Sequence, residues 1–390
     1  MKNQTGITAN PFKEFFESEK NGGILLMGCV VVALAMANLP LQGFYFGILR
    51  HKMGFAFDGF VLQKSIEHWI NDGLMSIFFL LVGLEIKREV VKGELSAFQK
   101  SSLPISAALG GMLIPALIFF LSNVGHPSLR GWAIPMATDI AFALAILSLL
   151  GNRVPNSLRV FLAALAIVDD LGAIIVIAVF YTSQIIVSHL VAAGVLFLLL
   201  LGLNRLGVKK WFAYLIPGIL LWYFAYKSGI HATIAGVLLA LTIPIEDEDG
   251  GSMLERLEHF LHKPVNYMIM PVFALANTGV IIERHALEGL QSPLSFGIML
   301  GLFVGKPLGI LLFSWIPVRM HFSVLPENAM WKHIIGLGFL GGIGFTMSIF
   351  ISLLSFHQTE FQSIAKISIL AISITSGIAG YVILRNTNKT

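Results

Sequence analysis

The sequence predicts an all-α protein that crosses a membrane many times. Of its 390 residues, 56% are hydrophobic and 12% are charged, and the mean hydropathy is +0.81. A soluble domain carries about twice that share of charged residues. The apolar residues are grouped in runs long enough to cross a bilayer as helices, which takes about 20 residues for each span. These features indicate a polytopic membrane protein of about 12 transmembrane helices.

Polar breaks divide the chain into twelve apolar segments. They cover residues 22–39, 66–84, 103–122, 132–150, 158–181, 190–203, 211–223, 230–244, 265–282, 296–315, 334–355 and 364–384. The seventh and eighth segments are short, which is typical of tilted or incomplete spans. An even number of spans places both termini on the same side of the membrane.

The basic residues indicate which side that is. If both termini are cytoplasmic, 18 of the 26 Lys and Arg residues face the inner side and 7 face the outer side, with Lys306 left inside a span. This asymmetry follows the positive-inside rule, so we predict cytoplasmic termini. The net charge of +4 gives no indication of a nucleic-acid partner. The single cysteine, Cys29, cannot form a disulfide within the chain.

Two adjacent aspartates, Asp169 and Asp170, lie in the middle of the fifth segment. An ionised carboxylate in hydrocarbon is costly, so such residues face a bundle interior or a water-filled cavity. They indicate either a site for a small cation or a proton, or a structural ion pair with a basic residue of another helix. We favour the site, because an ionisable residue within a membrane span marks a functional site by default. Lys306, the only Lys or Arg well inside a span, is the expected partner of one of the two aspartates.

Two further segments contain helix-breaking residues. In the fourth, Pro135 stands shortly before Thr138 and Asp139, and in the eleventh five glycines crowd into residues 336–344. After each break the sequences run alike, FALAI at 142–146 and FTMSI at 345–349. One broken helix in each half of the chain favours the inverted-repeat plan of transporters, in which unwound segments meet near the midplane and present backbone groups to an ion.

Residues 44–57 lie between the first two segments, on the outer side. Aromatic residues flank Arg50, His51 and Lys52, and two glycines punctuate the stretch. We predict a small β-hairpin whose exposed edge can pair with a second copy of the chain. A surface loop with aromatic anchors at the membrane interface is the alternative.

Charged residues gather at the ends of the second segment. Glu85, Arg88 and Glu89 are spaced i, i+3 and i+4, so they share one face of a helix and mark a cytoplasmic mouth. Asp72 is a further acidic residue near the other end of this segment. Solvated helix ends whose charges pair with one another are the more common reason for such a pattern.

Histidines stand near the starts of the eighth and ninth segments. Glu258, His259 and His262 lie within five residues and favour a cytoplasmic helix start that titrates near neutral pH. A metal site on His259 and His262 lacks a third ligand. His231, at the start of the eighth segment, can also titrate, although a lone histidine at a helix end is more often structural.

Five motifs together resemble the NhaA-type sodium/proton antiporters of bacterial inner membranes. They are FLLVGLE at 79–85, ATD at 137–139, VDDLG at 168–172, KSGIHAT at 227–233 and GKP at 305–307. The resemblance covers essentially the whole chain, and the motifs agree in order and spacing. This family is itself a known example of the inverted-repeat plan, so the resemblance implies that plan without testing it.

The resemblance implies a single membrane transport domain over residues 1–390, which is not an enzyme and needs no cofactor. It implies electrogenic exchange, in which more protons enter than Na⁺ or Li⁺ ions leave, activated at alkaline pH and serving sodium and pH homeostasis. The repeats are implied at about 103–181 and 296–384, with the fourth and eleventh helices crossing where they unwind. The segment 44–57 is implied as the outer hairpin through which the family forms homodimers.

The resemblance also implies roles for single residues. Asp169 and Asp170 match the family's aspartates for the transported cation and the proton. Thr138 and Asp139 match the polar pair at the break of the fourth helix, and Lys306 matches a lysine that partners the first aspartate. Eight more positions match those tied to the entrance funnel or the pH response: Asp72, Glu85, Arg88, Glu89, His231, Glu258, His259 and His262.

A mechanism follows from the adjacency of the two aspartates. Neighbouring side chains on a helix diverge by about 100°, so one can face Lys306 while the other faces an aqueous funnel. A cation that binds only when protons leave couples the two flows. The residues leave two other functions open: an intramembrane aspartyl protease with Asp139 and Asp170 as its dyad, and a sodium-coupled organic-solute symporter.

Overall fold

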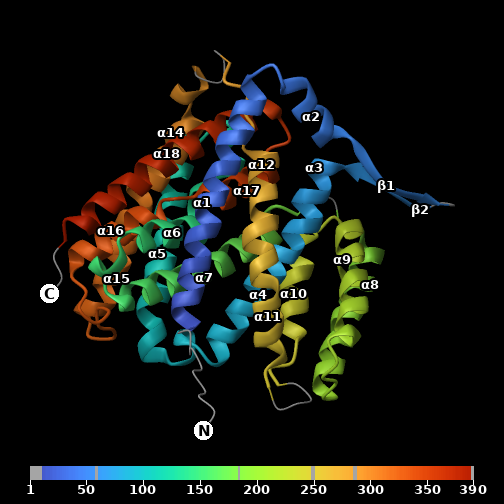
Figure 1. The fold of residues 1–390 in the computed structure, drawn as a ribbon, viewed down its shortest axis with the longest axis horizontal. Helices are drawn as coiled ribbons and strands as arrows, with labels where there is room; N and C mark the ends of the chain where they lie inside the picture. Colours follow the sequence, from blue (N-terminus) through green and yellow to red (C-terminus); the bar gives the residue numbers. More distant parts are fainter. Residues whose placement is uncertain (1–10, 58–59, 183–184, 247–250, 284–287, 388–390) are drawn as a thin grey trace, which may run out of the picture.

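The computed structural model is a bundle of α-helices from which one small β-hairpin extends (Figure 1). The structure describes residues 11–57, 60–182, 185–246, 251–283 and 288–387. Within these residues, six helices are long and apolar enough to cross a membrane, and two pairs of shorter helices meet the same criterion together. The predicted class, an all-α polytopic membrane protein, is therefore confirmed.

The first half of the chain runs from α1 to α9. Its helices are α1 (Pro11–Asn38), α2 (Gln42–Arg50), α3 (Ile66–His68), α4 (Met75–Val91), α5 (Phe98–Asn123), α6 (Ile140–Leu149), α7 (Asn156–Phe180), α8 (Val187–Arg205) and α9 (Phe212–Ser228). Short 3-10 turns lie between them, namely η2 (Glu94–Ser96), η3 (Pro127–Gly131), η4 (Ile134–Met136) and η5 (Gly151–Arg153).

The second half contains α10 (Thr233–Thr242), α11 (Met253–Pro264), α12 (Met270–Asn277), the 3-10 turn η7 (Gly289–Gln291), α14 (Pro293–Leu300), α15 (Lys306–Arg319), α16 (Trp331–Gly341), α17 (Phe345–Ser355) and α18 (Thr359–Arg385). Each of the twelve apolar segments falls on one helix or on consecutive helical stretches. The seventh and eighth correspond to α9 and α10, which have only 17 and 10 residues.

In the described part of the chain, three π-helical turns interrupt these helices: η1 (Trp69–Leu74) before α4, η6 (Val265–Ile269) before α12 and η8 (Gly301–Gly305) before α15. A π-turn adds one residue to a helical turn and is frequent at functional sites. Asp72 lies within η1, and η8 runs directly into Lys306. No apolar pattern in the sequence predicts these turns.

The β-hairpin lies later in the chain than predicted. Strand β1 (Lys52–Phe57) pairs antiparallel with β2 (Phe60–Ser65). The stretch before β1 is the helix α2, so the prediction of a hairpin over residues 44–57 is wrong in its first half. The hairpin extends away from the helices, beside α3 and the upper end of α9 in Figure 1.

The helix α2 forms because its spacing buries a pair of side chains. Tyr45 and Leu49 are four residues apart, so a helix places both on one face, and both are buried. The Tyr45 hydroxyl donates a hydrogen bond to the carbonyl oxygen of Leu275 at 2.6 Å. A strand would turn neighbouring side chains to opposite faces, but the tertiary contacts of Tyr45 and Leu49 override the strand preference of the aromatic residues around them.

Two helices are broken in the interior of the bundle. The helical turns over Pro127–Met136 meet α6 at a bend of 42°, and α16 meets α17 at a bend of 45°. The breaks fall where Pro135 and the glycine-rich stretch predict them. The backbone N–H of Asp139 in the first break donates to the carbonyl oxygen of Ile343 in the second at 2.7 Å, so the two breaks are joined directly.

Close packing around α5 brings the two halves of the chain together. Helices α5 and α15 lie along one another, and α7 packs against α5. Gly110 and Gly309 lie at the closest approach of α5 and α15, where a Cβ atom on either glycine would collide with the backbone of the other. This arrangement places the first turn of α15 close to the middle of α7.

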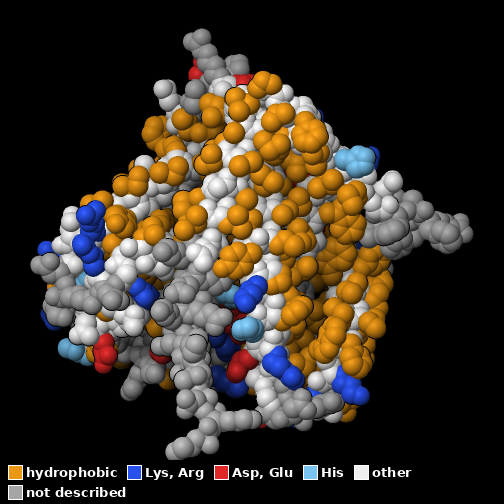
Figure 2. Space-filling model, in the orientation of Figure 1, with side chains coloured by type: hydrophobic (Ala, Val, Ile, Leu, Met, Phe, Trp, Pro, Cys, Tyr) orange, Lys and Arg blue, Asp and Glu red, His pale blue; other side chains and the backbone are white. Residues whose placement is uncertain are grey.

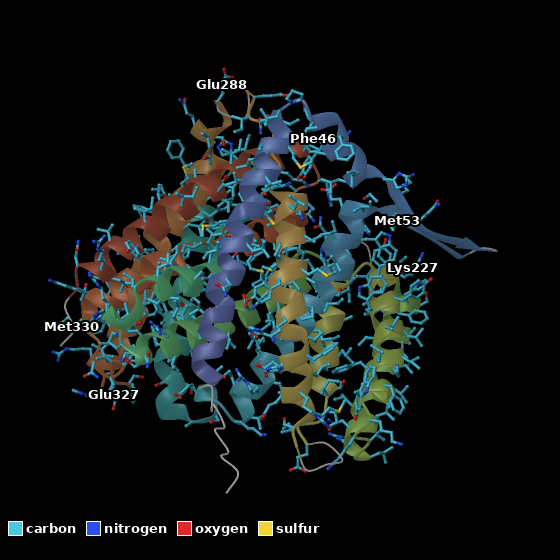
Figure 3. All side chains as sticks on the ribbon, viewed as in Figure 1. Phe46, Met53, Lys227, Glu288, Glu327 and Met330 are labelled. Carbon is cyan, nitrogen blue, oxygen red and sulfur yellow. The ribbon has the colours of Figure 1, made fainter. Side chains whose placement is uncertain are left out.

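The surface of the bundle is that of a protein in lipid. Hydrophobic side chains cover most of the face seen in Figure 2, with Lys and Arg gathered toward its lower part. Leu198 of α8 and Ile216 of α9 are 66% and 65% exposed, and apolar patches of this kind mark a membrane or protein contact. Glu288 and Glu327, which flank α14 and α15, lie at opposite ends of the molecule (Figure 3).

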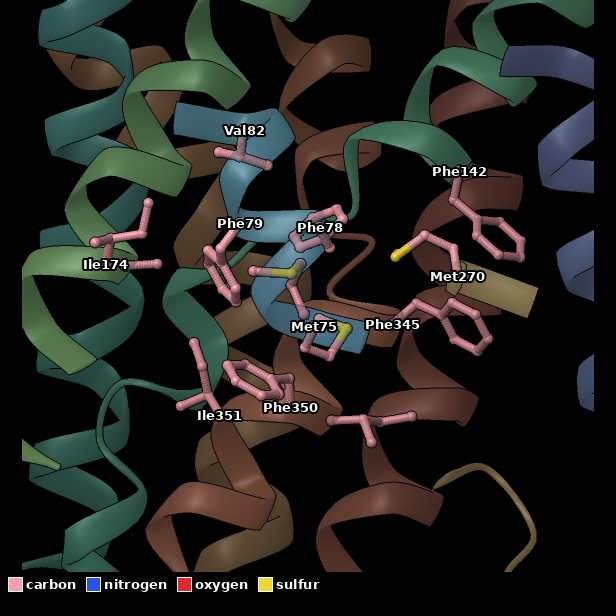
Figure 4. Packing of buried hydrophobic residues seen from close by; sticks show 14 of the residues in the cluster. Met75, Phe78, Phe79, Val82, Phe142, Ile174, Met270, Phe345, Phe350 and Ile351 are labelled. Atoms are coloured by element: carbon pink, nitrogen blue, oxygen red, sulfur yellow. The ribbon is translucent and has the colours of Figure 1, made fainter. Parts of the chain in front are cut away.

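An apolar cluster surrounds the first turns of α4 (Figure 4). Phe79 packs against Phe350 of α17 with ring centres 5.5 Å apart, and Phe350 lies 6.1 Å from Phe273 of α12. Met75 and Phe79 are completely or almost completely buried. The cluster therefore occupies the stretch of the bundle just after Asp72.

Candidate functional site

Helix α7 carries the two adjacent aspartates into the centre of the bundle. Asp169 and Asp170 are only 1% and 4% exposed. Because neighbouring side chains on a helix diverge by about 100°, the two carboxylates enter different surroundings. One is enclosed by protein groups, and the other borders a cavity.

Asp169 is on the enclosed side. Its Oδ2 accepts a hydrogen bond from Lys306 Nζ at 2.5 Å, and the two groups form an ion pair in which both side chains are fully buried. The Thr138 hydroxyl is placed to donate to the same oxygen at 2.6 Å or to the carbonyl oxygen of Gly341 at 2.9 Å. Oδ1 of Asp169 is buried and has no hydrogen-bond partner among the described residues. A buried charge pair of this kind is retained only with good geometry, which the two donors Lys306 and Thr138 supply.

Asp170 is on the open side, where it lines a cavity of about 40 Å³. The polar residues of the wall are Glu85 of α4, Thr138, Asp139, Asp170 and Asn266 of η6. Apolar side chains complete it, among them Phe78, Leu81 and Met347. The cavity has room for a few water molecules or a small ion with part of its hydration shell.

Asp139 caps two helices at once. Its Oδ1 accepts from the backbone N–H of Phe142 at 3.1 Å, at the start of α6. Its Oδ2 accepts from the backbone N–H of Thr346 at 3.1 Å and from the Thr346 hydroxyl, at the start of α17. The N-terminal end of a helix carries partial positive charge, so one carboxylate compensates two such ends where they meet.

Positive and donor groups compensate the other ends of the broken helices. Lys306 Nζ donates to the carbonyl oxygen of Met136, the last residue of η4. The carbonyl oxygen of Gly341, the last residue of α16, lies against the Thr138 hydroxyl. The C-terminal end of a helix carries partial negative charge, which an ammonium group stabilises. Asp139 therefore compensates the positive helix ends at the two breaks, and Lys306 compensates a negative one.

The predicted cytoplasmic charges form a paired cluster next to the cavity. Arg88 donates through Nη2 to Glu89 Oε1 at 3.0 Å, and its Nε lies 3.4 Å from Glu258 Oε2 on α11. Burial raises the pKa of Glu258, against the lowering effects of Arg88 and His262. Glu85, one turn before Arg88, reaches the cavity itself. The cluster thus connects the cavity with the ends of α4 and α11.

The two histidines of α11 differ in their contacts. Nε2 of His262 lies 3.4 Å from Nδ2 of Asn266, a residue of the cavity wall. His259 is exposed on the surface of α11. Of the two, His262 is therefore the one with a structural connection to the cavity.

Asp72 and His231 lie at the other end of the bundle. Asp72 is about 20 Å along the helix axis from Glu85, and it pairs with His68 Nε2 at 3.0 Å. His231 directly precedes α10. Neither residue borders the cavity. The structure therefore gathers Glu85 and the five residues of the predicted binding site in one place and leaves Asp72 and His231 apart from them.

Two residues of the site have no role in the sequence analysis. Thr346 holds Asp139, and Asn266 connects the cavity to His262. A threonine just after the glycine-rich break, where the matching run at 142–146 has alanine, is the signal that could have indicated Thr346. Asn266 stands as an isolated amide within an apolar segment, which is a weaker signal of the same kind.

Buried opposing charges meet at two interrupted helices, beside a small cavity lined by Glu85, Asp170 and Asn266. This combination defines an ion-coupled membrane transporter, because it places carboxylates where a desolvated cation or a proton can bind and surrounds them with helices that can rearrange.

Comparison with known proteins identifies the family. The family model for Na⁺/H⁺ antiporter 1 matches residues 13–384. The chain is 56% identical over 384 residues to the Na(+)/H(+) antiporter NhaA 2 of Flavobacterium johnsoniae, covering 98% of this chain and 94% of that protein. It is 51% identical to NhaA of Bordetella parapertussis and 48% identical to NhaA of Shewanella loihica, each over 95% of both chains. The chain belongs to the Na⁺/H⁺ antiporter 1 family. It is a transporter and not an enzyme, so the protease alternative is wrong.

Proposed function

We propose that this Na⁺/H⁺ antiporter extrudes Na⁺ or Li⁺ by letting the cation and protons compete for Asp169 and Asp170. The observation that carries the proposal is the difference between the two carboxylates. Asp169 is neutralised by Lys306, whereas Asp170 borders the cavity with no basic side chain among the described residues of its wall. Two carboxylates close together in a site of low dielectric constant share protons readily, and they titrate as a unit. A hard cation such as Na⁺ needs oxygen ligands, and the ionised carboxylates are the ones the site offers.

The charge balance of the site supports electrogenic exchange. Asp169, Asp170 and Lys306 together supply two carboxylates and one ammonium group, so more than one proton can leave before a single Na⁺ binds. A cycle in which more protons enter than sodium ions leave moves net positive charge inward. Transported ions are the only small molecules that this mechanism requires, and no cofactor takes part.

Alternating access is the second part of the proposal. We infer twelve spans with inverted repeats at about 103–181 and 296–384, whose broken helices cross beside the site. The wall of the cavity follows α4 from Phe78 to Glu85, while Phe79 packs with Phe350 near the start of α4. In this conformation the site therefore opens toward Glu85, the side we assign to the cytoplasm.

Activation at alkaline pH is assigned to the charged cluster between α4 and α11. Arg88, Glu89 and Glu258 are held within ion-pair distance, so a change in the protonation of Glu258 alters the attraction between the two helices. His262 lies beside this cluster, and histidine is the residue type that most often acts as a proton switch near neutral pH. Asp72 and His231 have no contact with the cavity, and we assign them to the outer face.

We further propose a location and an assembly. The protein lies in a bacterial inner membrane with both termini in the cytoplasm, an orientation that the Lys and Arg bias supports. It forms a homodimer through the hairpin β1–β2, which extends away from the helices and whose strands pair only with one another among the described residues. A sodium-coupled symporter of organic solutes is disfavoured, because a cavity of about 40 Å³ is far smaller than the roughly 300 Å³ or more of organic-ligand pockets.

The test is Na⁺-induced proton movement in everted membrane vesicles. Asp170→Asn removes the ionisable group on the open side and keeps its shape, so we expect exchange to be abolished while the protein remains inserted. Asn204→Ala serves as the control, because Asn204 bonds to the carbonyl oxygen of Thr242 and does not line the cavity. Exchange by Asp170→Asn at the wild-type rate would overturn the proposal.

A further inference from the structure

The base of the hairpin β1–β2 is fastened to η1 and α9 through both of its strands. Trp69 of η1 donates through Nε1 to the carbonyl oxygen of Met53 on β1 at 2.9 Å. Nζ of Lys64 on β2 lies 5.6 Å from the ring centre of Tyr226 on α9, within the range of a cation–π contact. Because the two strands are held by two different elements, the hairpin cannot turn about its base without breaking one of these contacts.

Three aromatic rings connect the two points of attachment. Trp69 stacks with Trp222 of α9 at a distance of 6.1 Å between ring centres, and Trp222 stacks with Tyr226 at 6.0 Å. Nε1 of Trp222 also donates to the carbonyl oxygen of Asp72 in η1 at 3.2 Å. Together Lys64, Trp69, Trp222 and Tyr226 form the outer brace.

The outer brace is closely packed. His68 of α3 adds polar contacts to it, since its Nε2 lies 3.0 Å from Oδ2 of Asp72 and 3.1 Å from the hydroxyl oxygen of Tyr226. The cavity between these side chains has a volume of about 10 Å³, room for about one water molecule. With so many contacts and so little free space the rings cannot rotate independently, and the base of the hairpin is held rigidly.

The rest of the hairpin extends away from the bundle (Figure 1). Its strands pair with one another from Lys52 and Ser65 at the base to Phe57 and Phe60 near the tip. An isolated two-stranded hairpin is only marginally stable in water. The direction in which the hairpin points therefore depends on its base, where the outer brace holds it.

We propose that the outer brace preorganises the hairpin for pairing with a second copy of the chain. A sheet edge pairs with another sheet edge, and in a homodimer two identical hairpins meet. A hairpin that can swing loses this freedom on pairing, which weakens association. A braced hairpin has already lost it in the monomer, so the brace raises the affinity without contacting the partner. This inference rests on the proposed homodimer and names the residues that set its strength.

The experiment measures the Kd of the dimer for the full-length chain in detergent, by energy transfer between two differently labelled pools on dilution. Trp69→Phe removes the N–H that bonds to Met53 and keeps a ring in the stack. Lys64→Met removes the cation and keeps the stem of the side chain. Each change releases one strand, so we expect Kd to rise about threefold for each and about tenfold for both together.

Two substitutions elsewhere serve as matched controls. Trp315→Phe changes an exposed tryptophan of α15, and Lys332→Met changes an exposed lysine in the first turn of α16. Both residues lie outside the outer brace, so both variants should keep the wild-type Kd. A wild-type helical circular-dichroism spectrum shows that each variant is folded.

A spin label reports the motion of the hairpin directly. Gln63→Cys, in a chain whose single cysteine is removed by Cys29→Ser, places the label at an exposed position of β2. In diluted, monomeric protein the label should move more freely when Lys64→Met and Trp69→Phe are both present. Residues that acted only by contacting the partner would leave this motion unchanged.

Three results would overturn the inference. If the double variant dimerises with the wild-type Kd, the brace takes no part, and the proposed homodimer and antiport are untouched. If Kd rises but the label moves no more freely, the residues act by contacting the partner and not by holding the hairpin. If the wild type stays monomeric at every concentration, the proposed homodimer fails together with the inference. Should the double variant fail to insert, Trp69→Phe decides, because an unchanged Kd in that variant contradicts the brace.

Discussion

The two sides of α7 use the same residue type for different purposes. On the enclosed side, Asp169 is neutralised by Lys306, and the pair is held by Thr138 and the end of η4. On the open side, Asp170 borders a cavity shared with Glu85 and Asn266. The two aspartates are adjacent in the sequence. Their surroundings differ because neighbouring side chains on a helix point in directions about 100° apart.

This difference teaches how a buried charge acquires a role. A carboxylate whose charge is balanced within the protein contributes to structure, since removal of its partner leaves an uncompensated ion. A carboxylate that faces a hydrated cavity can exchange ligands with little rearrangement. We therefore expect changes on the enclosed side to lower stability as well as transport, and changes on the open side to alter transport with little effect on stability.

The largest expected effect is on stability, from Lys306→Ala. The change leaves Asp169 buried without its cation, which costs about 3–5 kcal/mol of unfolding free energy in comparable pairs. We expect a strongly lowered Tm in detergent by thermal unfolding, whereas Asp170→Asn should retain a Tm close to the wild type. Lys332→Ala, on an exposed side chain, is the matched control. Equal decreases in Tm from Lys306→Ala and Asp170→Asn would contradict the distinction between the enclosed and the open side of α7.

A smaller effect is expected where the two broken helices are joined. Thr346→Val removes the hydroxyl that donates to Asp139 and keeps the shape of the side chain. A hydrogen bond to a charged group contributes about 1.5–3 kcal/mol, so stability and exchange rate should both fall. Thr375→Val is the control, because the Thr375 hydroxyl bonds only within its own exposed helix face. Identical behaviour of the two variants in unfolding and vesicle assays would show that Thr346 does not join the helices.

The smallest effect concerns Glu258 at the edge of the open side. Burial raises its pKa above the ordinary value of 4.5, so the folded protein favours the neutral carboxyl. The stability from this group is complete below that value and is lost as the pH rises through the raised pKa. Glutamine cannot ionise, so Glu258→Gln removes this pH-dependent loss of stability. The Tm of the variant should therefore decline less than that of the wild type from pH 4.5 upward.

The neighbouring His259 supplies the control for this pH series. His259 is exposed, so His259→Gln should follow the wild-type Tm at each pH. If the Tm of Glu258→Gln also followed that of the wild type at every pH, this would contradict a raised pKa of the Glu258 carboxyl.

Much of the fold follows from short-range pattern. Apolar runs predict where helices lie, because hydrocarbon requires a continuous stretch of apolar side chains. Pro135 and the glycines at 336–344 predict the two breaks, because these residues weaken helices locally. The aspartates and Lys306 are conspicuous as charges within apolar runs. These features need no knowledge of the tertiary structure.

The remaining features depend on contacts between distant segments. The burial of Tyr45 against α12 makes residues 42–50 helical, although their composition suits a strand. Which aspartate meets Lys306 depends on the rotation of α7, and a helix predicted with uncertain ends leaves that rotation open. The π-turns and the contact of Asn266 with His262 likewise follow from packing, which no local pattern encodes.

The most direct test of the central claim is to count the protons released when Na⁺ binds. Purified protein in weakly buffered detergent solution is titrated with NaCl at several pH values, and proton release and heat are recorded together. Competition at Asp169 and Asp170 predicts that protons leave as Na⁺ binds and that Na⁺ affinity weakens toward acidic pH. Binding of Na⁺ that releases no protons at any pH would contradict it.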